Sequence, residues 1–302
     1  MKFSATGEFK EFLIAQITEF KEDQSASSHW KNYENALKIQ ISSIKEDKIN
    51  LILKGFGFGN YHKRNLLGIA KNLPTTIFLK FVLRSSKSTE KADKKISECL
   101  GFLRSYDSFR MCKTIDYLAN FDKLEKSRKV CVIGDGFGRL GILLKFLYPH
   151  LSIIQVNLSK TLTYDIASTL KAFPNCSYSI NKAVSEVNDF TFIDSKHKIL
   201  VPNCDFYINI ASMQEMNYDE IFEYFHIITN SLNSFFYCCN RVEKILPDGN
   251  VIRFDNYPWE DNLSVIDESI CSWHLWQPVN KPPFYKKFDG LIKHKLVKVE
   301  SK

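Results

Sequence analysis

The sequence lacks the features of several protein classes. No apolar run approaches the ~20 residues that a membrane-spanning helix needs, and the first residues, MKFSATGEFKEFL, contain no apolar core of a signal peptide. The eight cysteines form no C-x-x-C pair, and no cysteine–histidine cluster has zinc-finger spacing. We therefore expect a cytoplasmic protein with no membrane span, with reduced cysteines and with no bound metal.

Basic residues are concentrated in the first part of the chain. Residues 1–128 hold 23 basic and 15 acidic side chains, whereas residues 129–302 hold 18 and 19, within a formal net charge of +7. A basic surface of this kind suits anionic ligands. Only five of the 23 basic residues are arginines, and no nucleic-acid-binding motif accompanies them. We therefore expect no nucleic-acid partner, although a nucleic-acid-binding enzyme remains an alternative.

The first part has the apolar spacing of helices. Residues 8–20, 29–44 and 107–121 each place apolar side chains on one helical face. The run TIFLKFVLR at 76–84 indicates a strand, and the Lys/Ser/Glu-rich residues 85–95 indicate an exposed loop. Residues 1–125 are thus predicted to form a mostly helical, basic accessory domain that contributes to substrate binding.

The second part has a different pattern, in which short apolar strands alternate with helices. The predicted strands are 129–133, 151–158, 177–184, 205–211 and 235–239, and predicted helices include 160–172 and 217–231. Such alternation is typical of an α/β fold with a parallel sheet. Residues 126–302 are therefore predicted to form one Rossmann-like domain.

A glycine-rich loop joins the first of these strands to a helix. The segment KVCVIGDGFGRLG places Gly134, Asp135, Gly136, Phe137 and Gly138 directly after the strand. Glycines permit a tight turn and a close approach of ligand to backbone, and the helix N-terminus adds N–H groups with partial positive charge. The loop fits the pyrophosphate of a dinucleotide or the amino-acid end of S-adenosylmethionine (SAM). An incidental glycine turn is the alternative.

The end of the second strand normally carries an acidic side chain that binds a cofactor ribose. In this chain the position is Asn157, 19 residues after Gly138. An amide oxygen can accept a hydroxyl hydrogen bond, although a carboxylate would accept more. A strand-end asparagine that caps the next helix is an equally acceptable interpretation.

A second glycine loop offers a competing cofactor site. In INLILKGFGFGN, Gly55–Gly59 also follow an apolar run, and Arg84, Ser85 and Ser86 at the end of the predicted strand 76–84 could bind the 2′-phosphate of NADP. This interpretation predicts an NADP-dependent oxidoreductase. A structural turn is the preferred interpretation, because this half lacks a long series of strand–helix units.

Four segments together resemble a known family. KVCVIGDGFGRLG, CDFYINIASMQEMN, FFYCCNRVEKILPDGN and VIRFDNYPW are similar to the sugar O-methyltransferases of bacterial surface-glycan gene clusters, over roughly residues 100–275. The resemblance implies a seven-stranded Rossmann-like class I methyltransferase domain, SAM as methyl donor, and the hydroxyl of a nucleotide sugar or glycan as acceptor. Two positions depart from the class I pattern, because Val132 and Asn157 stand where acidic residues are common.

The loop after the strand 205–211 carries the principal catalytic candidate. Carboxyl ends of strands line the cofactor site in such folds, so Ala211 and Ser212 are expected at the cofactor. Glu215 is the first candidate for general base and Gln214 for orienting the substrate. An acidic residue at a helix N-terminus is the structural alternative for Glu215.

Further candidates lie nearer the C-terminus. His274 is the second candidate base, although a histidine among aromatic neighbours is more often a structural residue. Arg241 could bind an anionic group on the acceptor, or could form a surface ion pair. Through the Y-P-W block, the resemblance adds Tyr257 and Trp259 as substrate contacts.

Overall fold

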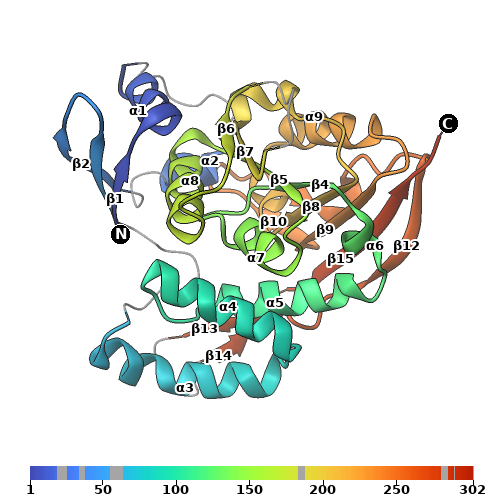
Figure 1. Ribbon diagram of the computed structural model, residues 1–302. Coiled ribbons are helices and arrows are strands. Elements are labelled where there is room, and N and C mark those ends of the chain that lie inside the picture. Colours follow the sequence, from blue (N-terminus) through green and yellow to red (C-terminus); the bar gives the residue numbers. More distant parts are fainter. Residues whose placement is uncertain are drawn as a thin grey trace.

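The computed structural model describes residues 1–18, 26–33, 38–54, 64–182, 188–279, 285–288 and 290–301. Its centre is an eight-stranded sheet in the order β12-β15-β9-β8-β4-β5-β7-β6 (Figure 1). The strands are β4 (Lys129–Ile133), β5 (Ser152–Asn157), β6 (Tyr178–Ile180), β7 (Phe190–Asp194), β8 (Phe206–Ile210), β9 (Phe235–Arg241), β12 (Leu263–Ile270) and β15 (Ile292–Val299). The six strands β4 to β9 run parallel to one another. β15 pairs antiparallel with both β9 and β12.

Helices cover both faces of this sheet, because successive side chains of each buried strand alternate between two apolar clusters. Val130 and Val132 belong to the cluster under the helices α4 (Lys87–Leu100), α5 (Tyr106–Ala119), α7 (Arg139–Leu147) and α8 (Ser159–Ala172). Cys131 and Ile133 belong to the cluster under α9 (Tyr218–Thr229) and the hairpin β10 (Glu243–Ile245)–β11 (Val251–Arg253). The mixed α/β fold with a mostly parallel central sheet is thus confirmed.

The alternating pattern of the second part predicted five of the eight strands of the central sheet and missed β7, β12 and β15. The strands predicted at 129–133, 151–158, 177–184, 205–211 and 235–239 correspond to β4, β5, β6, β8 and β9, and the helices at 160–172 and 217–231 to α8 and α9. The remaining short elements are α6 (Lys123–Lys126), the 3₁₀ segments η1 (Ser195–Leu200), η2 (Met213–Glu215) and η3 (Phe254–Asn256), and the antiparallel pair β13 (Trp276–Pro278)–β14 (Tyr285–Lys287).

The first part contains a sheet that the sequence did not predict. β1 (Lys2–Ala5), β3 (Ile49–Lys54) and β2 (Lys38–Ile44) form a three-stranded antiparallel sheet with β3 in the middle. The helix predicted at 8–20 is present as α1 (Gly7–Thr18). The single helix predicted at 29–44 is wrong, because α2 (Ser28–Tyr33) is followed by β2, in which half-buried Ile39 and Ile41 alternate with exposed Gln40.

Two further predictions for the first part are wrong. Residues 76–84, predicted as a strand, mostly belong to α3 (Leu66–Val82), in which Leu79 is buried while Ile77 and Phe81 are exposed. Residues 85–95, predicted as a loop, largely belong to α4. Ser86 accepts a hydrogen bond from Thr89 N and so caps α4, whose Lys- and Glu-rich side is only its solvent face.

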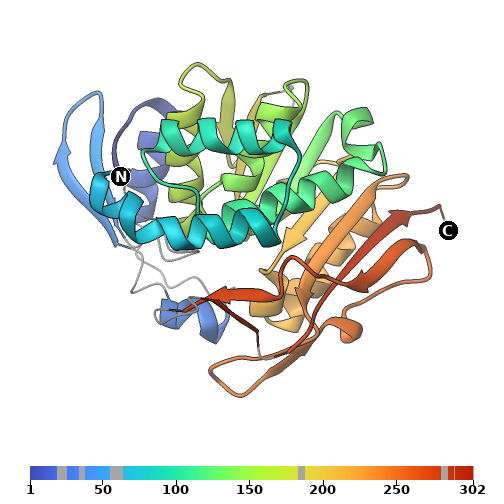
Figure 2. The same ribbon diagram turned by 90° about the horizontal axis from the view of Figure 1, so that it is seen from below.

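The helices of the first part pack directly on the sheet that follows them. In Figure 2 the cyan to green helices α3, α4 and α5 lie in front of the sheet. At the centre of this contact Asp93 of α4 is fully buried and bonds Arg139 at the start of α7 and Arg104 (Nε–Oδ2 2.6 Å). One apolar cluster continues from Phe9 to Leu296. The domain boundary at 125/126 stays a prediction.

Among the described residues, no helix combines the length and the apolar character that crossing a membrane requires.

Candidate functional site

The glycine loop adopts the left-handed backbone conformation that favours glycine. Gly134, Gly136 and Gly138 have positive φ angles of 72°, 59° and 67°, and Phe137 between them has φ 74°. A Cβ at Gly134 would lie 2.2 Å from Ser212 Oγ, so only glycine lets the loop after β4 approach the loop after β8. The two loops therefore meet at the carboxyl ends of neighbouring strands, where parallel α/β sheets bind ligands.

Asp135 occupies the N-terminus of α7 from within the loop. Its carboxylate accepts hydrogen bonds from Leu140 N (2.9 Å), Gly141 N (2.7 Å) and Gln155 Nε2 (3.1 Å). Burial raises the pKa of Asp135 from 3.8 to about 6, and these hydrogen bonds oppose the rise. At neutral pH the loop therefore already holds a negative charge, which disfavours a pyrophosphate at the same helix end.

Asn157 is fixed at the end of β5 by two hydrogen bonds. Its Nδ2 donates to Asp165 Oδ2 (2.9 Å) and its Oδ1 accepts from Leu158 N (3.0 Å). Burial, and secondarily the charge of Asp135, raises the pKa of Asp165 well above its usual value. A third carboxylate at position 157 would add like-charge repulsion, whereas the asparagine donates to Asp165. This explains why the chain departs from an acidic residue there.

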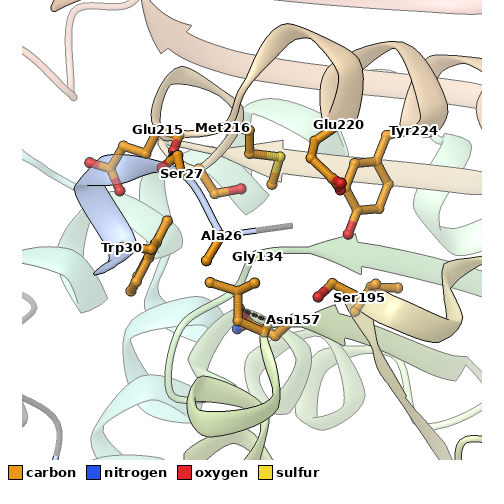
Figure 3. Close-up of a pocket in the computed structure, with 13 residues that line it drawn as sticks. Ala26, Ser27, Trp30, Gly134, Asn157, Ser195, Glu215, Met216, Glu220 and Tyr224 are labelled. Atoms are coloured by element: carbon orange, nitrogen blue, oxygen red, sulfur yellow. Dashed lines mark hydrogen bonds between the residues drawn. The ribbon is translucent and has the colours of Figure 1, made fainter. Parts of the chain in front are cut away.

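Two adjoining cavities open at this end of the sheet. The first, which we call the Tyr224 pocket, is shown in Figure 3, and the space inside it, including open solvent at its mouth, is about 440 Å³. The second, the His274 pocket, measures about 610 Å³ on the same basis. The two pockets share the lining residues Trp30, Gly134, Asn157, Ser212 and Glu215.

The pockets bring together most of the predicted cofactor residues. Asp135, Gly136 and Ala211 line the His274 pocket beside the five shared residues. Phe137 and Gly138 are not among the lining residues. Phe137 is buried against the ring of Tyr164 at 5.2 Å, and Gly138 is the residue before α7. Their roles as cofactor contacts stay predictions.

Glu215 lies at the junction of the two pockets, on η2. Its carboxylate is 3.3 Å from His29 Nε2 and 3.8 Å from Lys244 Nζ, and its backbone oxygen accepts a hydrogen bond from Ser27. Ser27, His29 and Trp30 belong to α2 or directly precede it, so the first part of the chain contributes one wall of the site. Figure 3 shows Ser27 and Trp30 on the same side as Glu215.

His274 lines the second pocket and is otherwise buried, with 2% of its surface exposed. Burial, followed by the positive charge of Arg110, lowers the pKa of His274 well below 6.5, so the ring is neutral at pH 7. Thr114 Oγ1 lies 3.4 Å from His274 Nε2. A neutral imidazole at a cavity wall can accept a proton or bind a metal.

An ion pair that the sequence did not reveal lines the His274 pocket together with the glycine loop. Asp107 and Arg110 of α5 pair with each other and line the His274 pocket, and the guanidinium carbon of Arg110 is 4.4 Å from the ring centre of Tyr106. Burial lowers the pKa of Arg110. Their spacing of three residues is common on helix surfaces, so nothing local marked this pair as functional.

The predicted substrate residues lie outside the two pockets. Gln214 is buried, and its Oε1 accepts from Arg241 N (2.7 Å). The Arg241 guanidinium lies over the Phe288 ring at 4.8 Å. Tyr257 and Trp259 pack with Phe254 in the cluster under α9, where Trp259 Nε1 donates to Phe254 O. Their substrate roles stay predictions.

The competing Gly55–Gly59 loop lies outside the described residues. The elements on either side do not form the strand–helix–strand unit that an NADP site needs. β3 before the loop is the middle strand of an antiparallel sheet, and 76–84 after it is mostly helix. Ser86, offered as a phosphate contact, caps α4 and bonds Asp116.

No family model matches the chain, and no curated protein sequence matches it. Among the solved structures that match is a Thermoplasma acidophilum protein, with 11% identity and a TM-score of 0.46; the match covers 72% of this chain and 98% of that one. TehB from Haemophilus influenzae has 11% identity and a TM-score of 0.46, and the match covers 66% of this chain and 69% of that one. Magnesium protoporphyrin IX methyltransferase from Synechocystis with bound SAH has 12% identity and a TM-score of 0.44, and the match covers 76% of this chain and 100% of that one. At these scores the fold assignment depends on the strand order of the chain itself.

Proposed function

We propose that the chain is a SAM-dependent methyltransferase that transfers a methyl group to a sugar hydroxyl. The observation that carries the proposal is the meeting of the Gly134 loop, Asn157 and the Ser212 loop around two joined pockets at the carboxyl ends of β4, β5 and β8. β15 lies antiparallel between β9 and β12. Apart from the short edge strand β6, the central sheet has seven strands, which is the number that the family resemblance implies.

The charges of the loop favour SAM over a dinucleotide. Asp135 carries a negative charge beside the backbone that a pyrophosphate would have to approach, whereas SAM brings an ammonium and a sulfonium. Adenosine would occupy the Tyr224 pocket, with Asn157 at the ribose. The methionine part would lie against Gly134, Ala211 and Ser212, and the acceptor would enter the His274 pocket.

The His274 pocket has the groups that a sugar acceptor requires. The carboxylates of Asp107 and Glu215 can accept hydroxyl hydrogen bonds, and Trp30 offers an aromatic ring for a sugar face. The net charge of residues 1–128 suits an acceptor that carries phosphate, such as a nucleotide sugar. A surface glycan is the other acceptor in this class.

SAM supplies an electrophilic methyl group with a good leaving sulfur. The chain must hold the acceptor oxygen about 3–3.5 Å from the methyl carbon and in line with the carbon–sulfur bond. The oxygen forms the new bond to carbon, the electron pair of the broken bond remains on sulfur, and the hydroxyl proton passes to a base. Glu215 is the first choice for that base, held by His29 and Lys244, and His274 is the second.

Titration calorimetry with SAM, SAH and NADPH tests the cofactor. We expect SAM and SAH to bind the wild-type chain and NADPH not to bind. Gly134→Ala should abolish SAM binding because its methyl group would meet Ser212 Oγ at 2.2 Å. Gly249→Ala is the matched control, because Gly249 also has a positive φ but has no atom near an added Cβ. Binding of NADPH alone, or normal SAM binding by Gly134→Ala, would contradict the proposal.

Labelled SAM with a panel of nucleotide sugars and glycans then tests the acceptor. Mass spectrometry should find one added methyl group on a sugar hydroxyl. SAM binding with transfer only to RNA, or only to a nitrogen of a small amine, would keep the methyltransferase and reject the sugar.

A further inference from the structure

Two cysteines and a histidine converge behind the His274 pocket. Cys239 lies on β9, Cys271 directly follows β12, and His274 comes three residues later. β15 lies between β9 and β12 and aligns these strand ends, since His294 is opposite Cys239 and Cys271 N donates to Ile292 O. The two sulfurs and one imidazole nitrogen all lie within 4.8 Å of one another, and all three residues are buried.

The segment from Cys271 to His274 is a C-x-x-H sequence that follows β12. Its sulfur and its imidazole lie within 4.8 Å of each other and of the Cys239 sulfur, so the segment brings both side chains to one place beside β9. A sulfur and an imidazole nitrogen from one short segment are a common pair of metal ligands.

We propose that Cys239, Cys271 and His274 bind one zinc ion. Thiolate sulfur and imidazole nitrogen are the ligands that Zn²⁺ takes in proteins, at about 2.3 Å and 2.0–2.1 Å. Tetrahedral bonds of these lengths separate the ligand atoms by about 3.5–3.8 Å. Atoms already within 4.8 Å of one another need to move by only about 1 Å to reach that geometry.

The charges around the cluster are compatible with a metal. Two thiolates and one neutral imidazole balance the two positive charges of zinc, so the loaded site would be neutral in its buried setting. Arg110 acts electrostatically on both sulfurs, and its own charge is paired with Asp107.

The site would stand beside the reaction, because His274 also lines the second pocket. Three protein ligands leave one position of a tetrahedral zinc open for water or for an acceptor oxygen. A hydroxyl bound there loses its proton more readily. His274 would then be a ligand, and Glu215 would remain as the base. The zinc site itself does not depend on the proposed methyl transfer.

Metal analysis of the full chain, purified without chelators and dialysed against Zn²⁺ buffer, tests the site without SAM. We expect about one zinc per chain. Cys239→Ser and Cys271→Ser should each bring the zinc content close to zero. Cys238→Ser is the matched control, because Cys238 is the next residue on β9, equally buried, but faces the other apolar cluster. It should keep the full zinc content.

Cobalt substitution of the wild-type chain gives a second measurement that needs no variant. Bound Co²⁺ should produce the thiolate-to-metal absorption of a tetrahedral sulfur site. A wild-type chain that holds no more zinc than Cys239→Ser, or that shows no such absorption, would overturn the proposal. Six reactive thiols in the denatured wild-type chain, in place of the eight that its cysteines supply, would also overturn the proposal if both Cys239→Ser and Cys271→Ser then showed seven, because this result would indicate a disulfide between Cys239 and Cys271.

Discussion

Asp135 makes the stability of the chain depend on pH in an unusual direction. Its pKa rises from 3.8 to about 6 because the folded chain buries the carboxyl group under the glycine loop. A group whose pKa is raised by folding contributes stability that is fully present below the unfolded value and is lost as the pH rises through the folded value. The rise from 3.8 to about 6 corresponds to about 3 kcal/mol.

Asp135→Asn removes this titration while it keeps the shape of the side chain. The free energy of unfolding of the wild type, minus that of Asp135→Asn, should fall by about 2 kcal/mol between about pH 4.5 and about pH 7. Urea denaturation at several pH values, followed by circular dichroism, measures both free energies. The variant also loses one of the acceptors for Leu140 N and Gly141 N, but this loss does not change with pH.

Asp189→Asn is the control for this experiment. Hydrogen bonds from Lys145 and Ser177 lower the pKa of Asp189, so its contribution is lost only as the pH falls below its usual range. The difference between wild type and Asp189→Asn should therefore stay nearly flat above about pH 4.5. A flat difference for Asp135→Asn, or one that grows with pH, would refute the assignment of a raised pKa to Asp135.

Two further predictions concern catalysis and stability. Glu215→Gln should lower kcat at saturating SAM by about 10²–10⁴-fold, because it removes the base, and should leave the affinity for SAM unchanged. Turnover assays measure the first effect and calorimetry the second. Unchanged turnover would exclude Glu215 as the general base. Asp93→Ala should lower the free energy of unfolding by about 3–5 kcal/mol in urea, because it leaves buried Arg139 without its carboxylate; a loss under about 1 kcal/mol would show that the pair contributes little.

Five strands of the second half could be predicted because their signals are local. Each predicted apolar run between Lys129 and Cys239 is long enough for one buried strand, and the glycines of 134–138 mark the turn that follows the first of them. β12 was missed because most of its side chains are exposed and form no apolar run. The same rule failed at 76–84. Ile77 and Phe81 are exposed on α3, so their apolar character does not report burial in a strand.

The candidate site could be predicted only where its residues follow strand ends. Glu215 lies five residues after β8 and Asn157 is the last residue of β5, and they meet because parallel strands end at one edge. Trp30 and Arg110 reach the pockets from helices far away in the sequence. Nothing in their local sequence shows this, since it depends on how α2 and α5 pack.

The bond between Asp93 and Arg139 has a practical consequence for anyone who would work with the cofactor-binding half alone. Arg139 opens α7 immediately after Gly138, and only 1% of its surface is exposed. An expression fragment that begins at residue 126 would lack the carboxylate that neutralises this arginine and would expose the apolar surface under α4 and α5. The helix α7 that follows the glycine loop would then lack its contacts with α4 and α5. We therefore expect such a fragment to be insoluble.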